Sequence, residues 1–366
     1  MEQYQPGHYM DFSWQMCYAN DRFDVDWFRS CASVQQMKLL GQEYPKYKDD
    51  PMASYVVNYW QALGVTKDFY PCDLETAPSR RDAHHYSVLR PAQYREETYP
   101  VVYFCHGGGQ DAFDAETYGM AERIPQDGFL YVCPNRYGPE EFDRILGEMA
   151  ENGYPIDQRR IYVMGFSGGS GSAAEVALAY PERVAGVALF PGPNAFNQMD
   201  LQTVPQPFLD NPALRVPVLC MGGTCDGGDN WPLVDDTSFQ NLNHWMESVS
   251  RVPGYQPTNL AEAKQRMAQS KSQVERVFGL GFDRGYIDEI EDTYCYVGDY
   301  MAEDGVALAR FCSVAGLPHG VFPMFLGVAW AFLSKFSRNT ETGALEYPKP
   351  EMDFRTRRVK KEEEPK

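Results

Sequence analysis

The segment from residue 160 to residue 180 constrains the fold of this 366-residue chain more than any other. Residues 160–166 form an apolar run typical of a buried strand, and residues 168–180 have the pattern of a helix rich in Ala, Ser and Gly. Only Ser167 separates the two, inside Gly165-Phe166-Ser167-Gly168-Gly169. A strand that becomes a helix within one residue predicts a positive φ at that serine and room only for small neighbours.

The rest of the chain repeats the same alternation of apolar strands and helices. Further strands are predicted at residues 99–105, 129–133, 184–190, 216–221 and 308–314, and further helices at 140–152, 237–250 and 322–336. Strands that are apolar on both faces are typical of parallel sheets with helices on both sides. We therefore expect an α/β fold with a mostly parallel central sheet covered by helices.

Three segments lie outside this repeat. Residues 1–84 are aromatic and acidic, with helical pieces near 26–40 and 51–63, and we expect an N-terminal extension packed on a catalytic domain at 85–346. Residues 252–305 form an insertion before the last strand, either a cap over the site or surface decoration. Residues 347–366 are rich in proline and charge, which predicts a disordered tail.

Composition restricts the partners and the compartment. The formal net charge of −18 argues against binding nucleic acid or an anionic membrane, because both would repel this surface. The sequence contains no apolar run of the roughly 18–20 residues that a membrane span needs. Its nine cysteines fall partly inside apolar strands, which favours reduced core thiols over a disulfide framework. With a polar, acidic start to the chain, we expect a cytoplasmic protein, and we leave a homo-oligomer open.

Ser167 is a candidate nucleophile, because the predicted turn exposes its hydroxyl beside a helix N-terminus. The positive end of that helix favours negative charge on a substrate oxygen. A tetrahedral intermediate needs two backbone N–H donors. We predict Gly168 as one donor, and Gly108 or Gly109 in the glycine loop after the strand at 99–105 as the other.

A catalytic serine needs a histidine base and a carboxylate, which follow it along the chain in this kind of sheet. His319 lies in a turn between the last strand and the last helix, whereas His244 lies inside a predicted helix. We predict His319 as the base and a structural role for His106. Asp226 is the first carboxylate after the strand at 216–221 and is predicted as the acid, with Asp229 as the alternative. No cofactor or metal is expected.

These motifs resemble the feruloyl esterase and poly(3-hydroxybutyrate) depolymerase-like branch of the α/β hydrolases. The similar segments are YPVVYFCHGGG, YPIDQRRIYVMGFSGGS, AYPERVAGVALFPG, VPVLCMGGTCD and GLPHGVFP. Gly222 stands where the family has the histidine of its HGTxD motif. The resemblance implies the α/β-hydrolase fold, a catalytic triad and an oxyanion hole.

Together, the residues and the resemblance predict a serine carboxylic-ester hydrolase that works through an acyl-enzyme. The expected substrate is a small-molecule or oligomeric ester, soluble, with a phenolic (feruloyl-type) or hydroxyacyl group. A peptidase of the prolyl-oligopeptidase type and an acyltransferase would use the same three residues. A non-enzymatic binding protein would have lost one of them, and Ser167, Asp226 and His319 are all present.

Overall fold

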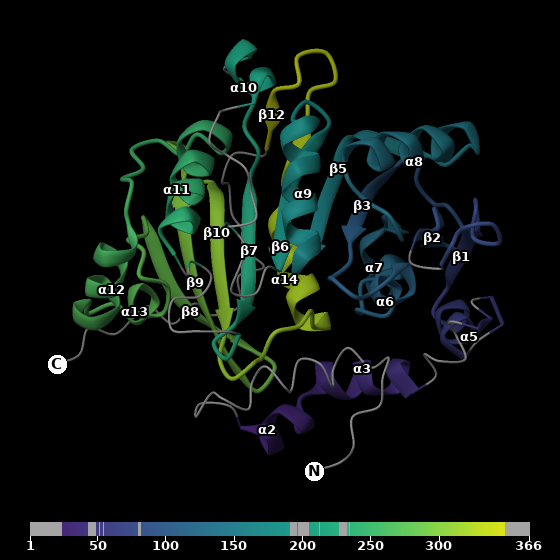
Figure 1. Cartoon of the computed structure of the whole chain (residues 1–366), viewed down its shortest axis with the longest axis horizontal. Helices are drawn as coiled ribbons and strands as arrows, with labels where there is room; N and C mark the ends of the chain where they lie inside the picture. The colour runs from purple at the N-terminus through teal and green to yellow at the C-terminus, as the bar shows by residue number, and fades with distance from the viewer. Residues whose placement is uncertain are drawn as a thin grey trace.

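The computed structural model describes residues 24–42, 49–50, 52–53, 55–79, 82–190, 196, 205–211, 213–226, 233 and 235–347. The described residues build one ten-stranded sheet in the order β1-β2-β4-β3-β5-β6-β7-β10-β9-β8 (Figure 1). Its strands are β1 Val65–Tyr70, β2 Tyr86–Pro91, β3 Tyr99–Cys105, β4 Leu130–Pro134, β5 Ile156–Phe166, β6 Val184–Phe190, β7 Val218–Gly223, β8 Arg284–Ile290, β9 Thr293–Met301 and β10 Ala307–Val314.

The centre of the sheet is parallel. Strands β4, β3, β5, β6, β7 and β10 all pair in parallel with their neighbours in that row. The edges are antiparallel, with β1 and β2 on one side and β9 and β8 on the other. This strand order, together with the strand–Ser167–helix turn between β5 and α9, is the α/β-hydrolase fold that the sequence predicted.

Helices cover the sheet on both faces, with α9 in front of it in Figure 1 and α14 behind it. The longer ones are α3 Ala32–Gln42, α5 Tyr55–Ala62, α8 Pro139–Glu151, α9 Gly168–Ala179, α11 Asp236–His244, α12 Leu260–Gln269 and α14 Pro323–Leu333. The shorter ones are α2 Val25–Ser30, α6 Ala112–Glu116, α7 Ile124–Asp127, α10 Gln206–Asp210 and α13 Gln273–Phe278, and α11 continues as a π-helical turn over Trp245–Val249. None of the helices in the described ranges combines the length and apolar character that crossing a membrane requires.

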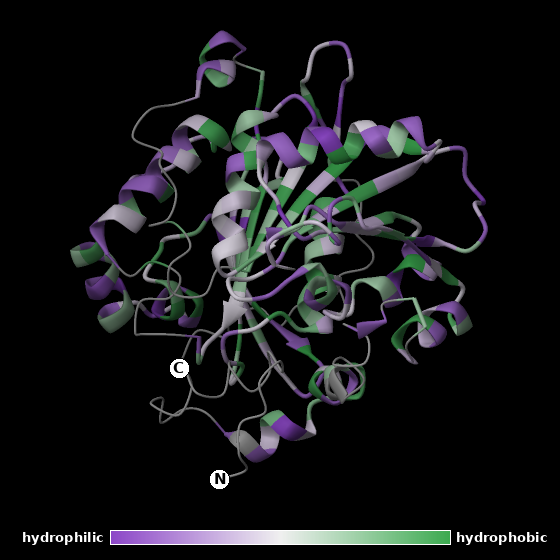
Figure 2. Ribbon diagram, turned by 45° about the vertical axis from the view of Figure 1, so that its right-hand side comes forward, coloured by the Kyte–Doolittle hydropathy of each residue, from purple (hydrophilic) through white to green (hydrophobic). Residues whose placement is uncertain are grey.

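The core lies where helices meet the sheet. Strands β3, β4, β6 and β7 are buried along their whole length. Figure 2 shows these hydrophobic strands at the centre and hydrophilic residues on the helices around them. Continuous apolar strands of this kind need cover on both faces, which explains why the sequence predicted them correctly. The eight cysteines in the described ranges are free thiols, and all of them except Cys72 are buried.

The insertion at 252–305 contributes strands that the sequence did not predict. Its polar part forms α12 and α13, and its acidic part forms the β8–β9 hairpin, which pairs through β9 with β10 and extends the sheet. Asp299 on β9 is fully buried and accepts hydrogen bonds from Arg284 and Arg310. Burial alone would raise the pKa of Asp299, but its pairing with both arginines outweighs burial and lowers that pKa. The charged carboxylate is therefore stable inside the sheet.

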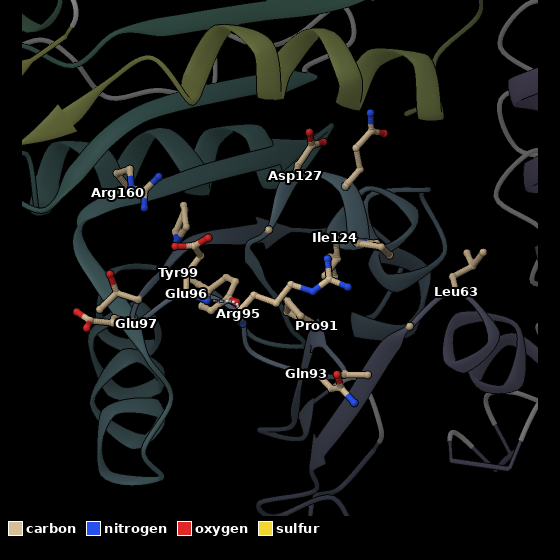
Figure 3. Close-up of a pocket in the computed structure, with 17 residues that line it drawn as sticks. Leu63, Pro91, Gln93, Arg95, Glu96, Glu97, Tyr99, Ile124, Asp127 and Arg160 are labelled. Carbon is tan, nitrogen blue, oxygen red and sulfur yellow. Dashed lines mark hydrogen bonds between the residues drawn. The ribbon is translucent and has the colours of Figure 1, made fainter.

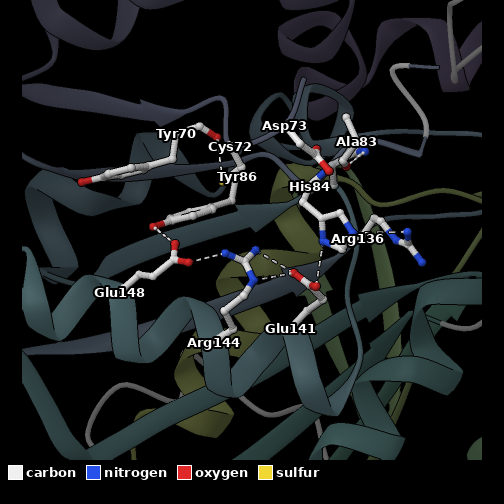
Figure 4. Close-up of polar contacts among 11 residues, drawn as sticks. Tyr70, Cys72, Asp73, Ala83, His84, Tyr86, Arg136, Glu141, Arg144 and Glu148 are labelled. Carbon is white, nitrogen blue, oxygen red and sulfur yellow. Dashed lines mark hydrogen bonds and ion pairs between the residues drawn. The ribbon is translucent and has the colours of Figure 1, made fainter. Parts of the chain in front are cut away.

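The N-terminal segment also reaches the sheet, because β1 pairs with β2 at one edge. Figure 4 shows how α8 secures this side through a row of charged side chains. Arg144 donates to Glu141 over 2.7 Å, and Glu141 contacts the His84 ring at 2.8 Å. Glu148 accepts from the Tyr86 hydroxyl at 3.0 Å. These contacts join α8 to β2 and to the loop before it.

Candidate active site

Ser167 adopts the strained backbone that its sequence context predicts, with φ 51° and ψ −121°. Two contacts hold this conformation. The Ser167 N–H donates to the Phe190 carbonyl on β6 over 2.8 Å, and the Ser170 hydroxyl donates to the Gly165 carbonyl over 2.8 Å. A non-glycine residue in this region costs about 1–3 kcal/mol, which the surrounding bonds must offset. Such strain is typical of a serine held for reaction.

The glycines on either side of Ser167 permit this turn. A Cβ at Gly165 would lie 2.2 Å from the carbonyl oxygen of Gly169, and a Cβ at Gly169 would lie 2.3 Å from the carbonyl oxygen of His106. Both distances are far below van der Waals contact, so no larger residue fits at either position. The elbow and the glycine loop after β3 therefore pack directly against each other.

The predicted oxyanion donors lie close together at the surface of this packing. A Cβ at Gly168 would be 3.8 Å from the Gly108 nitrogen. Gly108, Gly109 and Gly168 are exposed, and the N–H groups of Gly108 and Gly109 donate to no acceptor within the described ranges. Gly168 is the first residue of α9, where an N–H has no partner in its own helix. Gly109 has φ 81°, which glycine adopts readily. The arrangement leaves backbone donors free beside Ser167, as an oxyanion hole requires.

His106 lies under this loop. Its Nε2 atom is 2.8 Å from the Asn135 carbonyl and its Nδ1 atom is 2.9 Å from the Gly107 carbonyl, and the ring is buried. Gln110 also folds back on the loop, because its side-chain oxygen accepts from the Gly107 N–H at 2.9 Å. These contacts agree with the structural role expected for His106.

Asp226 and His319 meet in the structure, with Oδ1 of Asp226 3.0 Å from Nδ1 of His319. Both side chains are nearly buried, at 2% and 5% exposure. A carboxylate can only accept, so Nδ1 carries the proton and Nε2 is left to take one. Burial lowers the pKa of His319, but the charge of Asp226 and the hydrogen bond to it outweigh burial and raise that pKa above 6.5.

The His319 ring contacts the Ser167 turn through Phe166. The rings of His319 and Phe166, the residue before Ser167, are 4.8 Å apart between centroids and inclined by 31°. Ser167, Asp226 and His319 follow the carboxyl ends of β5, β7 and β10, so all three lie at the same edge of the parallel sheet. His244 ends α11, and the alternative acid Asp229 lies outside the described residues.

The loop that carries Asp226, residues 224–226 and called the acid loop below, is bonded to the loop that carries His319, which the sequence did not reveal. Cys225 N–H donates to the Leu317 carbonyl over 3.0 Å, and Gly316 N–H donates to the Thr224 hydroxyl over 2.9 Å. A Cβ at Gly223 would lie 1.9 Å from the Leu317 oxygen. The Gly222-Gly223-Thr224 segment could have indicated this contact between the loops, because glycine allows two backbones to approach closely and threonine supplies the hydrogen-bond acceptor.

A cluster of buried aromatic side chains includes Phe190, whose carbonyl accepts from the Ser167 N–H. Phe104, Phe190, Phe322 and Phe325 are at most 1% exposed and pack against one another in the core. Side chains buried to this extent do not line an open pocket. They carry no argument for an aromatic acyl group.

The cavity shown in Figure 3 lies away from this site. Its volume is about 920 Å³, and it is lined by residues that include Tyr99, Arg160 and Ile124. Tyr99 begins β3, whereas the glycine loop follows Cys105 at the other end of the same strand. The cavity therefore opens at the edge of the sheet opposite to Ser167.

Neither a protein-family model nor a curated protein sequence matches this chain. Among solved structures, it is similar to an S-formylglutathione hydrolase from Agrobacterium tumefaciens, at 16% identity and TM-score 0.37 over 51% of this chain and 84% of the other. It is also similar to the fluorophosphonate-binding serine hydrolase FphF from Staphylococcus aureus, at 16% identity and TM-score 0.36 over 52% and 86%. Esterase B from Lactobacillus rhamnosis gives 16% identity and TM-score 0.33 over 57% and 80%.

Proposed function

We propose that this protein is a serine carboxylic-ester hydrolase. The observation that carries the proposal is the hydrogen bond from His319 to Asp226 beside the strained Ser167 turn. A buried carboxylate that fixes the histidine tautomer, next to a serine at a helix N-terminus, is the arrangement that activates a hydroxyl for acyl transfer.

In the proposed reaction, the Ser167 hydroxyl attacks the ester carbonyl and gives its proton to Nε2 of His319. The backbone N–H groups of Gly168 and of Gly108 or Gly109 hold the oxyanion. His319 then protonates the departing alkoxide, which leaves as an alcohol, and an ester joins the acyl group to Ser167. Water attacks that ester with His319 as base, which releases the acid and restores the hydroxyl. Asp226 stabilises the imidazolium formed in each step.

The substrate class that we propose is a soluble small-molecule or oligomeric ester, with phenolic and hydroxyacyl esters as the first candidates. The exposure of Gly108, Gly109 and Gly168 supports this proposal, because a substrate could reach the proposed donors from solvent. A panel of p-nitrophenyl acetate, methyl ferulate, a 3-hydroxybutyrate ester and a peptide p-nitroanilide tests this class, with Ser167→Ala as the control.

The proposal predicts turnover of at least one ester by the wild-type protein and none above background by Ser167→Ala. Turnover of the peptide anilide alone would contradict the ester hydrolase and favour a peptidase. Transfer of the acyl group to an added alcohol in preference to water would replace it with an acyltransferase. Equal activity of Ser167→Ala and wild type would contradict all three.

A further inference from the structure

Helices α2 and α3 of the N-terminal segment lie at the edge of the sheet that carries the site. In Figure 1 they lie below the arrowheads of β7 and β10, which lead into the loops of Asp226 and His319. We call residues 315–322, between β10 and α14, the histidine loop. The described part of the N-terminal segment contacts this loop at both of its ends.

Trp27 of α2 packs on the first end. A Cβ at Gly316 would lie 2.6 Å from the Trp27 ring, so the indole is seated directly on the backbone there. Gly316 has φ 80°, a conformation that suits glycine. Gly316 is also the residue whose N–H bonds Thr224 in the acid loop. Trp27 therefore packs on Gly316, the residue at which the histidine loop is hydrogen-bonded to the acid loop.

Phe28 and Ser33 pack on the second end. The rings of Phe28 and Phe322 meet edge to face, with centroids 6.0 Å apart. The Ser33 hydroxyl accepts from the Met324 N–H over 3.2 Å. Met324 is in the first turn of α14, and Phe322 at its N-cap makes no side-chain cap bond. Ser33 thus supplies from another helix the acceptor that this helix start needs.

Glu291 fixes Ser33 in turn. Its carboxylate, in the β8–β9 turn, accepts from both the hydroxyl and the N–H of Ser33, the latter over 3.2 Å. Ser33 is 2% exposed, whereas Glu291 lies at the surface, so these bonds are partly shielded from water. The hydroxyl donates to Glu291 and accepts from Met324, which defines its orientation completely.

We propose that α2 and α3 position the catalytic base, and that Trp27 and Ser33 are the positioning residues. The proposal rests on the ester-hydrolase function and extends it. His319 lies between the two contacts, three residues after Gly316 and three before Phe322. Loss of either contact loosens the histidine loop without removing any group that touches substrate, so kcat falls and KM stays near its original value.

The test compares Ser33→Ala and Trp27→Leu with Val57→Ala in the full-length protein. Val57 is buried in α5, which packs on β1 at the far edge of the sheet, so its truncation lowers stability without touching the loop. We expect kcat to fall about 10- to 100-fold in the first two variants, the effect typical of a displaced catalytic group. KM should stay within about twofold of wild type, as for an interaction that is not part of substrate binding. Val57→Ala should keep the wild-type kcat.

A second readout separates positioning from general loss of structure. The Nδ1 proton of His319, bonded to Asp226, gives a strongly deshielded NMR resonance in a ¹⁵N-histidine sample. It should broaden by exchange with water in Ser33→Ala and stay sharp in Val57→Ala. Ser33→Thr keeps the hydroxyl and should recover most of kcat. If Ser33→Ala does not fold, Glu291→Gln takes its place, because it removes one of the two acceptors of Ser33.

Wild-type kcat in folded Ser33→Ala and Trp27→Leu would overturn the positioning role, and so would an equal fall in Val57→Ala. Both results leave the ester hydrolase intact, because they are measured against an active wild-type protein. Failure of the function itself has another signature, which is a wild-type protein that turns over no ester.

Discussion

Nδ1 of His319 lies 3.0 Å from Oδ1 of Asp226, although 93 positions separate the two residues in the chain. Parallel pairing of β7 with β10 brings them together, since both residues follow the carboxyl ends of neighbouring strands. Their loops are then joined by hydrogen bonds at Thr224 and Cys225. The position of His319 is therefore fixed by the sheet and by the loop that carries Asp226.

The pH dependence of the rate follows from this pair. His319 must be neutral to accept a proton, and the pKa of His319 is raised above 6.5 because Asp226 outweighs its burial. The acid limb of kcat/KM should therefore have its midpoint above pH 6.5, with activity lost as the pH falls through it. A pH series on a p-nitrophenyl ester measures this. Constant kcat/KM down to pH 5 would rule out His319 as the base.

Asp226→Asn tests the acid. An amide at this position can donate to Nδ1 and so favours the wrong tautomer, which lowers kcat by about 10⁴-fold in a comparable triad. It also removes the charge that raises the pKa of His319 while burial remains, so the acid limb should shift to lower pH. Asp229→Asn is the matched control and should leave kcat near wild type. The reverse pattern would transfer the role to Asp229.

Gly108→Pro tests the oxyanion donor. The change deletes the N–H, and no atom lies within 4 Å of a Cβ at this position. We expect kcat to fall about 10²- to 10³-fold with little change in KM, the loss typical of one oxyanion donor. Circular dichroism checks that the variant is folded. A folded variant with wild-type kcat would show that the donor is elsewhere in the loop.

Gly223→Ala tests the contact between the acid and histidine loops. A methyl group there would lie 1.9 Å from the Leu317 carbonyl oxygen, so the backbone must move. Overpacking of this kind costs about 1–3 kcal/mol or more, and we expect urea unfolding at a clearly lower midpoint. Gly147→Ala in α8 is the control, because no atom lies within 4 Å of its Cβ. That change should stabilise the helix by about 0.5–1 kcal/mol. Equal stability of both variants would contradict the contact.

The buried pair of Lys67 and Glu116 beside α6 allows a test of how an interior charge pair contributes to the free energy of unfolding. Their side chains are fully buried, with Nζ 2.9 Å from Oε2, and Phe113 lies against the amine. Burial raises the pKa of Glu116 and lowers the pKa of Lys67. Lys67→Met leaves a buried carboxyl without this partner and should cost about 3–5 kcal/mol in urea unfolding. Glu116→Gln keeps a polar contact and should cost less. A larger loss in Glu116→Gln would mean that the carboxylate charge is needed.

The sequence predicted the centre of the sheet because β3, β4, β5, β6, β7 and β10 are apolar in continuous runs. The hairpin β8–β9 escaped prediction because it is acidic and lies at an edge, where one face meets solvent and charges such as Asp299 are held by arginines. Strand β1 escaped because Lys67 and Asp68 hide its pattern, although Lys67 is buried against Glu116.

For the candidate site too, the sequence predicted some residues and gave no indication of others. The order of the motifs along the chain predicted Ser167, Asp226 and His319 as a set. In this fold such residues follow the carboxyl ends of parallel strands, here β5, β7 and β10. The contacts of Trp27 with Gly316 and of Ser33 with Met324 join residues nearly 300 positions apart, and they depend on how one helix pair packs. No local pattern in the sequence encodes such a contact.

Trapping the nucleophile tests the central claim most directly. An alkyl fluorophosphonate reacts with a serine only when a neighbouring base activates it, and peptide mass spectrometry locates the adduct. We expect one adduct per chain, on Ser167, with much slower labelling in His319→Ala and no labelling in Ser167→Ala. An adduct on another residue, or labelling of Ser167→Ala at the wild-type rate, would contradict the assignment of Ser167 as the nucleophile.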